Sequence, residues 1–189
     1  RSLPDYLKLE VNYDFFTRVQ TPELACGISL QPVDLVGVDA AIIFSDILVI
    51  PQAMGLEVWM EEGKGPHLPK VIETQKDVDA LITDGAEESL SYVYDALSLT
   101  KRELNNRVPL IGFAGAPWTI LCYMIEGKGS KTWEKAKQFA YTQPLLAHRL
   151  LQKITNITIS YLKLQAKAGA DTVQVFDSWA GSLSPADFK

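Results

Sequence analysis

The sequence has few of the features that mark membrane, secreted or nucleic-acid-binding proteins. None of its apolar stretches approaches the ~20 residues that a membrane-spanning helix needs. Its first residues, RSLPDYLKLE, lack the basic segment and following apolar segment of a secretory signal. The formal net charge of −5 argues against nonspecific binding to nucleic acid or anionic membranes, which usually shows as a basic patch. These absences favour a cytoplasmic protein with no nucleic-acid and no membrane partner.

Cysteine and histidine are also scarce, with two of each in 189 residues. Cys26 and Cys122 have no metal-type spacing and are too few for a disulfide framework. His67 and His148 are not paired with them, so we expect both to be structural or solvated. The sequence therefore predicts a reduced setting and no metal site.

What is present is the composition of an ordinary soluble globular protein, with 47% hydrophobic and 22% charged residues. The length suits one domain, and there are no repeats or evident linkers. Both ends look cut: Arg1 opens directly onto a Ser-Leu-Pro turn, and Ser184, Pro185 and Asp187 predict a helix start just before the chain stops. We expect residues 1–189 to be one domain truncated at both ends.

Three apolar runs of strand type alternate with segments of helical pattern. The predicted strands lie within 38–48, 107–116 and 170–181, and the predicted helices within 21–37, 75–100 (interrupted at Gly85), 117–127, 131–150 (broken near Pro144) and 151–168. Residues 56–68, rich in glycine and acid, predict a hairpin or loop. Alternation of this kind indicates parallel βαβ units. Three core strands are too few to close an eight-stranded barrel, so a small open α/β domain is the alternative.

One carboxylate, Asp46, interrupts the apolar run IIFSDILVIPQAMG. A buried acid is costly unless it is paired, so its position needs a reason. Each predicted strand ends in small or polar residues, and in parallel α/β proteins such residues gather at the carboxyl ends of the strands. We therefore expect one face to carry five candidates: Asp46, Thr119, Tyr123, Asp177 and Ser178.

Each candidate also has a simpler explanation. Asp177 and Ser178 are residue types that commonly cap a following helix. That explanation is weaker for Asp46, because Ile47 to Ile50 continue the apolar run instead of starting a helix. Tyr123 is of a type found more often in a core than in catalysis.

Gly112 and Gly115 in GFAGAP leave two alternatives open. They permit tight packing, or they let a ligand approach backbone N–H groups at a helix N-terminus.

The order of the short motifs resembles the uroporphyrinogen decarboxylase family. After the opening Arg with SLPDY come FSDILVIPQAMG, GKGP, GFAGAPWT, YMIEG and DSWAG; each is weak alone, but five in the same order are specific. The resemblance implies a (β/α)8 TIM barrel, usually of ~350 residues, of which this chain would be roughly the first half. It also implies a cofactor-free homodimer that converts the four acetates of uroporphyrinogen III to methyls, giving coproporphyrinogen and CO2.

Carried over by motif, the resemblance gives four positions a role. Arg1 would bind substrate carboxylates, Asp46 would hold the pyrrole N–H groups and take part in catalysis, and Tyr123 and Ser178 would hydrogen-bond the substrate.

One position departs from the family pattern. Many members have another Arg nine residues after Arg1, where this chain has Glu10. A second carboxylate contact is therefore in doubt, with Lys8 as a possible substitute.

The chemistry agrees with an acid in this place. Loss of CO2 from an acetate needs an electron sink, and an electron-rich pyrrole becomes one when its ring carbon is protonated to a cation. A preorganised carboxylate in a dry cleft stabilises such a cation by several kcal/mol. It also accepts several N–H bonds at once, which offsets its own desolvation.

Two alternatives come from other classes. Zinc-dependent corrinoid methyltransferases share the fold, but they need a thiolate and imidazole set, which Cys26 and Cys122 do not form. The second alternative is a non-catalytic binding or assembly fragment, since an incomplete barrel exposes strand edges that pair with partners.

Overall fold

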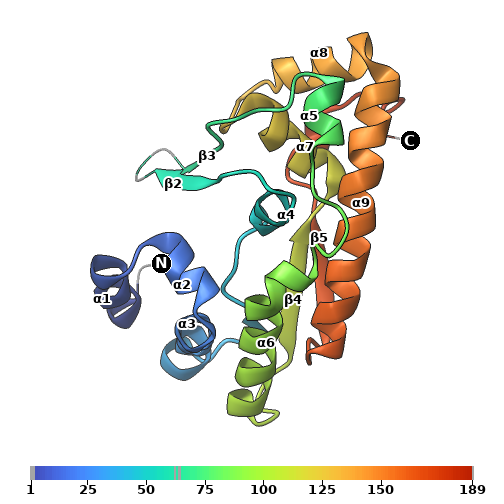
Figure 1. Cartoon of the computed structure of the whole chain (residues 1–189). Coiled ribbons are helices and arrows are strands. Elements are labelled where there is room, and N and C mark those ends of the chain that lie inside the picture. The colour runs from blue at the N-terminus through green and yellow to red at the C-terminus, as the bar shows by residue number, and fades with distance from the viewer. Residues whose placement is uncertain (1–2, 62, 64, 189) are drawn as a thin grey trace. The chain divides into compact units, whose positions relative to one another are not determined.

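The computed structural model describes residues 3–61, 63 and 65–188. The chain in Figure 1 forms two compact units, and each is described by itself. The first comprises Arg1–Asp46, Glu88–Ala114 and Tyr161–Gln174, and the second Ile47–Glu87, Gly115–Ser160 and Val175–Lys189.

The candidate residues all follow strands of a parallel sheet in the chain. The sheet contains β1 (Ala41–Ile42), β4 (Leu110–Gly115) and β5 (Thr172–Phe176), in the order β1-β4-β5. β1 runs parallel to β4 with Ala41 opposite Leu110. β4 and β5 are joined at both ends. The Asp171 amide donates to the Leu110 carbonyl where the two strands begin, and the Ala116 amide donates to the Phe176 carbonyl where they end. β5 therefore runs in the same direction as β4. The predicted parallel α/β class, with three core strands, is confirmed.

The first unit places helices against this sheet. They are α1 (Pro4–Asn12), α2 (Phe15–Gln20), α3 (Pro22–Val36), the 3-10 turn η1 (Glu88–Leu90) and α6 (Ser91–Leu104). α3 packs on α6 and β1. It begins at Pro22 and ends at Gly37 in a left-handed conformation (φ 77°), as predicted, and it continues through Pro32.

The second unit holds the hairpin and the helices that follow β4. Its elements are α4 (Val49–Ala53), β2 (Trp59–Glu61), β3 (Gly65–His67), α5 (Gln75–Asp79), α7 (Pro117–Glu126), α8 (Glu134–Thr142) and the 3-10 turn η2 (Ala180–Ser182). β2 and β3 pair antiparallel, which confirms the predicted hairpin. α9 (Pro144–Lys167) belongs partly to each unit and is continuous where the sequence predicted two helices.

Two long predicted elements are shorter than expected. Of the strand predicted over 38–48 only Ala41–Ile42 forms, and a helix, α4, starts at Val49. Our argument that the apolar run continues instead of starting a helix is therefore wrong. Leu48, Val49 and Ile50 are fully buried, and burial of a short helix demands the same apolar run as burial of a strand. The helix predicted over 75–100 is interrupted, as expected. The interruption is longer than Gly85 alone and covers the whole segment between the end of α5 at Asp79 and the start of η1 at Glu88.

The last described residues form a turn that a serine and an aspartate hold. The Ser184 hydroxyl accepts from the Asp187 amide, as in a capping box, and donates to Asp187 Oδ2, around a turn at 185–187. Among the described residues, no helix has both the length and the apolar character needed to cross a membrane.

Candidate functional site

In the second unit, the segment Asp177–Trp179 is fastened to the first turn of α7. Thr119 is fully buried; its hydroxyl donates to Asp177 Oδ1 at 2.8 Å and accepts from the Trp179 amide at 3.2 Å. The indole of Trp118 donates to the Trp179 carbonyl at 3.2 Å. Pro117 at the first helical position starts α7 where no N–H is needed, so these side chains follow the strand β4 directly.

The Trp179 ring of this segment packs with two further aromatic rings. The Tyr123 ring lies edge-on to Trp133, with centroids 5.2 Å apart, and to Trp179 at 6.2 Å. Trp133 and Trp179 are 4.8 Å apart. Tyr123 lies one helical turn after Thr119 and is 9% exposed, so one helix face presents both residues.

Ser178 differs from its neighbours in being exposed. Within the described part of the chain its hydroxyl has no hydrogen-bond partner, although both flanking residues are bonded to Thr119. The capping explanation does not hold for Asp177, because its carboxylate accepts from Thr119 and η2 begins after Trp179 without a side-chain cap. The structure thus brings together Thr119, Tyr123, Asp177 and Ser178.

Asp46 lies in the first unit, on the loop after β1, and is half-buried. Its charge is felt by two phenols of the same unit. Burial chiefly, and then the Asp46 carboxylate, raise the pKa of Tyr92 to about 12. Burial also raises the pKa of Tyr161, against the opposing effect of the nearby Ser45 hydroxyl, and Asp46 adds a smaller contribution in the same direction. Asp46 therefore lies near enough to both phenols to act on them electrostatically.

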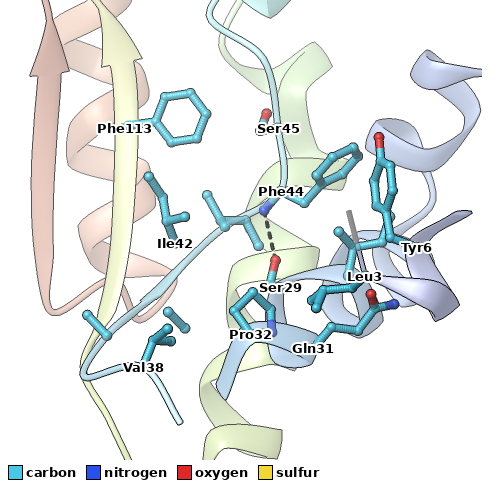
Figure 2. A pocket seen from close by; sticks show the side chains of 14 residues that line it. Leu3, Tyr6, Ser29, Gln31, Pro32, Val38, Ile42, Phe44, Ser45 and Phe113 are labelled. Carbon is cyan, nitrogen blue, oxygen red and sulfur yellow. Dashed lines mark hydrogen bonds between the residues drawn. The ribbon is translucent and has the colours of Figure 1, made fainter. Parts of the chain in front are cut away.

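A cavity of about 480 Å³ opens beside β1 in the first unit (Figure 2). The Phe44 amide, donating to Ser29 Oγ at 2.8 Å, fixes one wall of it. None of its lining side chains is charged: Leu3, Tyr6, Ile28, Ser29, Gln31, Pro32, Val38, Ala40, Ala41, Ile42, Ile43, Phe44, Ser45 and Phe113. A molecule with many carboxylates needs cations, so this cavity suits apolar packing better than such a substrate.

The structure describes only some of the residues predicted to bind substrate carboxylates. Arg1 lies outside the described residues. Glu10 contacts Arg18 at 3.6 Å, and Lys8 contacts Asp5 at 2.8 Å. Sequence reasoning missed Arg18, whose buried guanidinium also lies 5.0 Å from the Tyr6 ring centroid. Glu10 thus has a structural partner in the chain itself.

The two thiols are buried and free, and burial raises the pKa of both Cys26 and Cys122. They are therefore poor nucleophiles. No group of three or more His, Cys, Asp or Glu side chains among the described residues is placed to hold a metal ion. His148 is exposed and His67 half-buried.

Neighbouring side chains occupy the space beside both glycines of GFAGAP. A Cβ at Gly112 would collide with Gln165 Oε1, and one at Gly115 would lie 2.6 Å from Ile120 Cδ1. The packing explanation therefore accounts for them.

Comparison with known proteins identifies the family. The uroporphyrinogen decarboxylase (URO-D) family model matches residues 1–189. The chain belongs to the uroporphyrinogen decarboxylase family. It is 57% identical over 189 residues to the uroporphyrinogen decarboxylase of Christiangramia forsetii and 55% identical over 191 residues to that of Schizosaccharomyces pombe. It is covered completely by both matches but spans only 55% and 53% of those proteins, about half of their length.

A solved structure supports the fold. A methyltransferase from Methanosarcina mazei superposes with a TM-score of 0.74 over 89% of this chain and 50% of its own, at 20% sequence identity. At that identity the likeness concerns architecture alone. Half a barrel of the TIM type agrees with the three parallel strands and with the covered half of the relatives.

Proposed function

We propose that this chain is the first half or so of a uroporphyrinogen decarboxylase, a cofactor-independent carboxy-lyase of haem biosynthesis. The reaction would convert the four acetate side chains of uroporphyrinogen III to methyls, releasing four CO2 and leaving coproporphyrinogen. The full-length protein would be a cytoplasmic homodimer built on one TIM-barrel domain. Family membership over residues 1–189 is the observation that carries this proposal.

Asp46 would be the catalytic carboxylate. It would accept the pyrrole N–H groups and stabilise the cation formed when the ring carbon bearing the acetate is protonated. Its effect on the pKa of Tyr92 and Tyr161 supports this role, because a negative charge that disfavours a neighbouring phenolate favours a neighbouring cation.

Tyr123 and Ser178 would hydrogen-bond the substrate, and Arg1 would bind its carboxylates. The exposed hydroxyl of Ser178 supports its part in this set.

The test is a decarboxylation assay on the full-length protein. We expect uroporphyrinogen III to lose its acetate carboxylates in steps, ending at coproporphyrinogen. Chromatography of the oxidised porphyrins would monitor the reaction. Activity should survive a metal chelator. No decarboxylation, together with stoichiometric zinc in the purified protein, would contradict the proposal and favour a methyltransferase.

A further inference from the structure

The residues on both sides of Ser178 are tied to one buried hydroxyl. Thr119 Oγ1 donates to Asp177 Oδ1 at 2.8 Å and accepts from the Trp179 N–H at 3.2 Å. Thr119 is 0% exposed, so water does not compete for these bonds. Each is a side-chain bond across about 60 residues of chain, which neither a strand ladder nor a helix would form by itself.

The same short helix completes the attachment. The Ala116 amide donates to the Phe176 carbonyl at 2.8 Å, and the Trp118 indole to the Trp179 carbonyl at 3.2 Å. The backbone before and after Ser178 is thus held at several points, while the Ser178 side chain itself is exposed. An exposed hydroxyl on a fixed backbone is the arrangement that a substrate contact requires.

Thr119 also links this segment to the other proposed substrate contact. Tyr123 follows on the same face of α7, and its ring contacts Trp179 at 6.2 Å between centroids. A displacement of Trp179 would therefore disturb both Ser178 and the packing of Tyr123.

We infer that Thr119 is a positioning residue, which holds Ser178 at a fixed place beside Tyr123 without touching the substrate. This inference rests on the proposed substrate contacts of Ser178 and Tyr123. Thr119→Val keeps the shape of the side chain but leaves the Asp177 carboxylate and the Trp179 N–H each short of a partner. The segment would then shift or admit water.

The first experiment compares three variants of the full-length protein. Thr119→Val should lower kcat/KM for uroporphyrinogen about tenfold or more, mainly through KM, because misplacement of a contact costs binding. Thr119→Ser keeps the hydroxyl and should restore kcat/KM to within about twofold of wild type. Thr158→Val is the matched control: Thr158 is also buried, but its hydroxyl only bonds the Ile154 carbonyl of its own helix, so kcat/KM should not change.

A double-mutant cycle separates positioning from loss of stability. If Thr119 acts largely through Ser178, Thr119→Val should lower kcat/KM clearly less in the Ser178→Ala background than in the wild-type background. Full additivity, or a Thr119→Val protein with the kinetics of Thr158→Val, would overturn the inference.

Hydrogen–deuterium exchange gives a readout that does not need activity. The amide of Trp179 should exchange at least about tenfold faster in Thr119→Val than in wild type or Thr158→Val, because its acceptor is gone. Unchanged exchange would refute the inference even in an active enzyme. An inactive wild-type protein with faster exchange in Thr119→Val would instead count against the proposed function alone.

Discussion

At the scale of single residues, Asp46 is the position whose role most needs a test. It is half-buried on the loop after β1, and its charge raises the pKa of the Tyr92 phenol, so a catalytic carboxylate is one explanation of its position. The opposite explanation, a structural cap, would give the residue a stabilising role instead.

Replacing Asp46 by Asn distinguishes the two explanations. Asn has nearly the same size and accepts a hydrogen bond, but it carries no charge. In the full-length protein we expect kcat to fall by about 100-fold or more, with little change or a gain in melting temperature. A loss of about 1 kcal/mol in stability with normal kcat would identify a cap. Steady-state kinetics and thermal melting on the one variant provide both numbers.

Tyr92 predicts how stability responds to alkaline pH. Its pKa is raised from 10.0 to about 12 in the folded protein, so the unfolded chain releases the proton first as pH rises. The stabilisation is complete below pH 10 and is lost between about pH 10 and 12. Urea titrations across this range should show a shallower loss of unfolding free energy for Tyr92→Phe than for wild type. Tyr13→Phe, at an exposed phenol, is the control and should leave the slope unchanged.

At the scale of elements, β4 and its flanking helices show how closely the sheet is packed. Gln165 donates to the Phe113 carbonyl at 2.7 Å and fills the space beside Gly112. Because that space is already occupied, a glycine is required there for steric reasons, with no need for a ligand at the backbone.

Two glycine-to-alanine changes test this packing. Gly112→Ala should destabilise the protein by about 1–3 kcal/mol, because the new methyl would collide with a buried side chain. Gly27→Ala, in the exposed part of α3 with nothing near the new methyl, should stabilise it by about 0.5–1 kcal/mol. Chemical denaturation measures both. Equal effects of the two variants would contradict close packing at Gly112.

At the scale of the whole molecule, the sheet ends in exposed apolar strands. β5 leaves Val173, Val175 and Phe176 exposed by 38–44%, and Ile42 of β1 is 44% exposed. Strands with such faces normally pack against further structure. The matched relatives extend over about twice the length of this chain, which would supply it.

The 189-residue chain alone should therefore have little or no decarboxylase activity, since a catalytic cleft needs the strands and loops of the whole barrel. We expect turnover at least about 100-fold below that of the full-length protein. Light scattering should show a mass above that of the monomer, because the exposed edges associate. A cooperatively unfolding monomer with full-length activity would refute this expectation.

The sequence by itself determined the parallel α/β class, the limits of α3 and α7 and the family, because periodicity, prolines, glycines and ordered motifs are local signals. It could not determine that α4 begins at Val49, since a short apolar run serves a buried helix as well as a strand. Nor could it show that Glu10 contacts Arg18, or that Thr119 holds both neighbours of Ser178. Those bonds join residues far apart in the chain or on separate elements, and only the packed tertiary structure brings their atoms within reach.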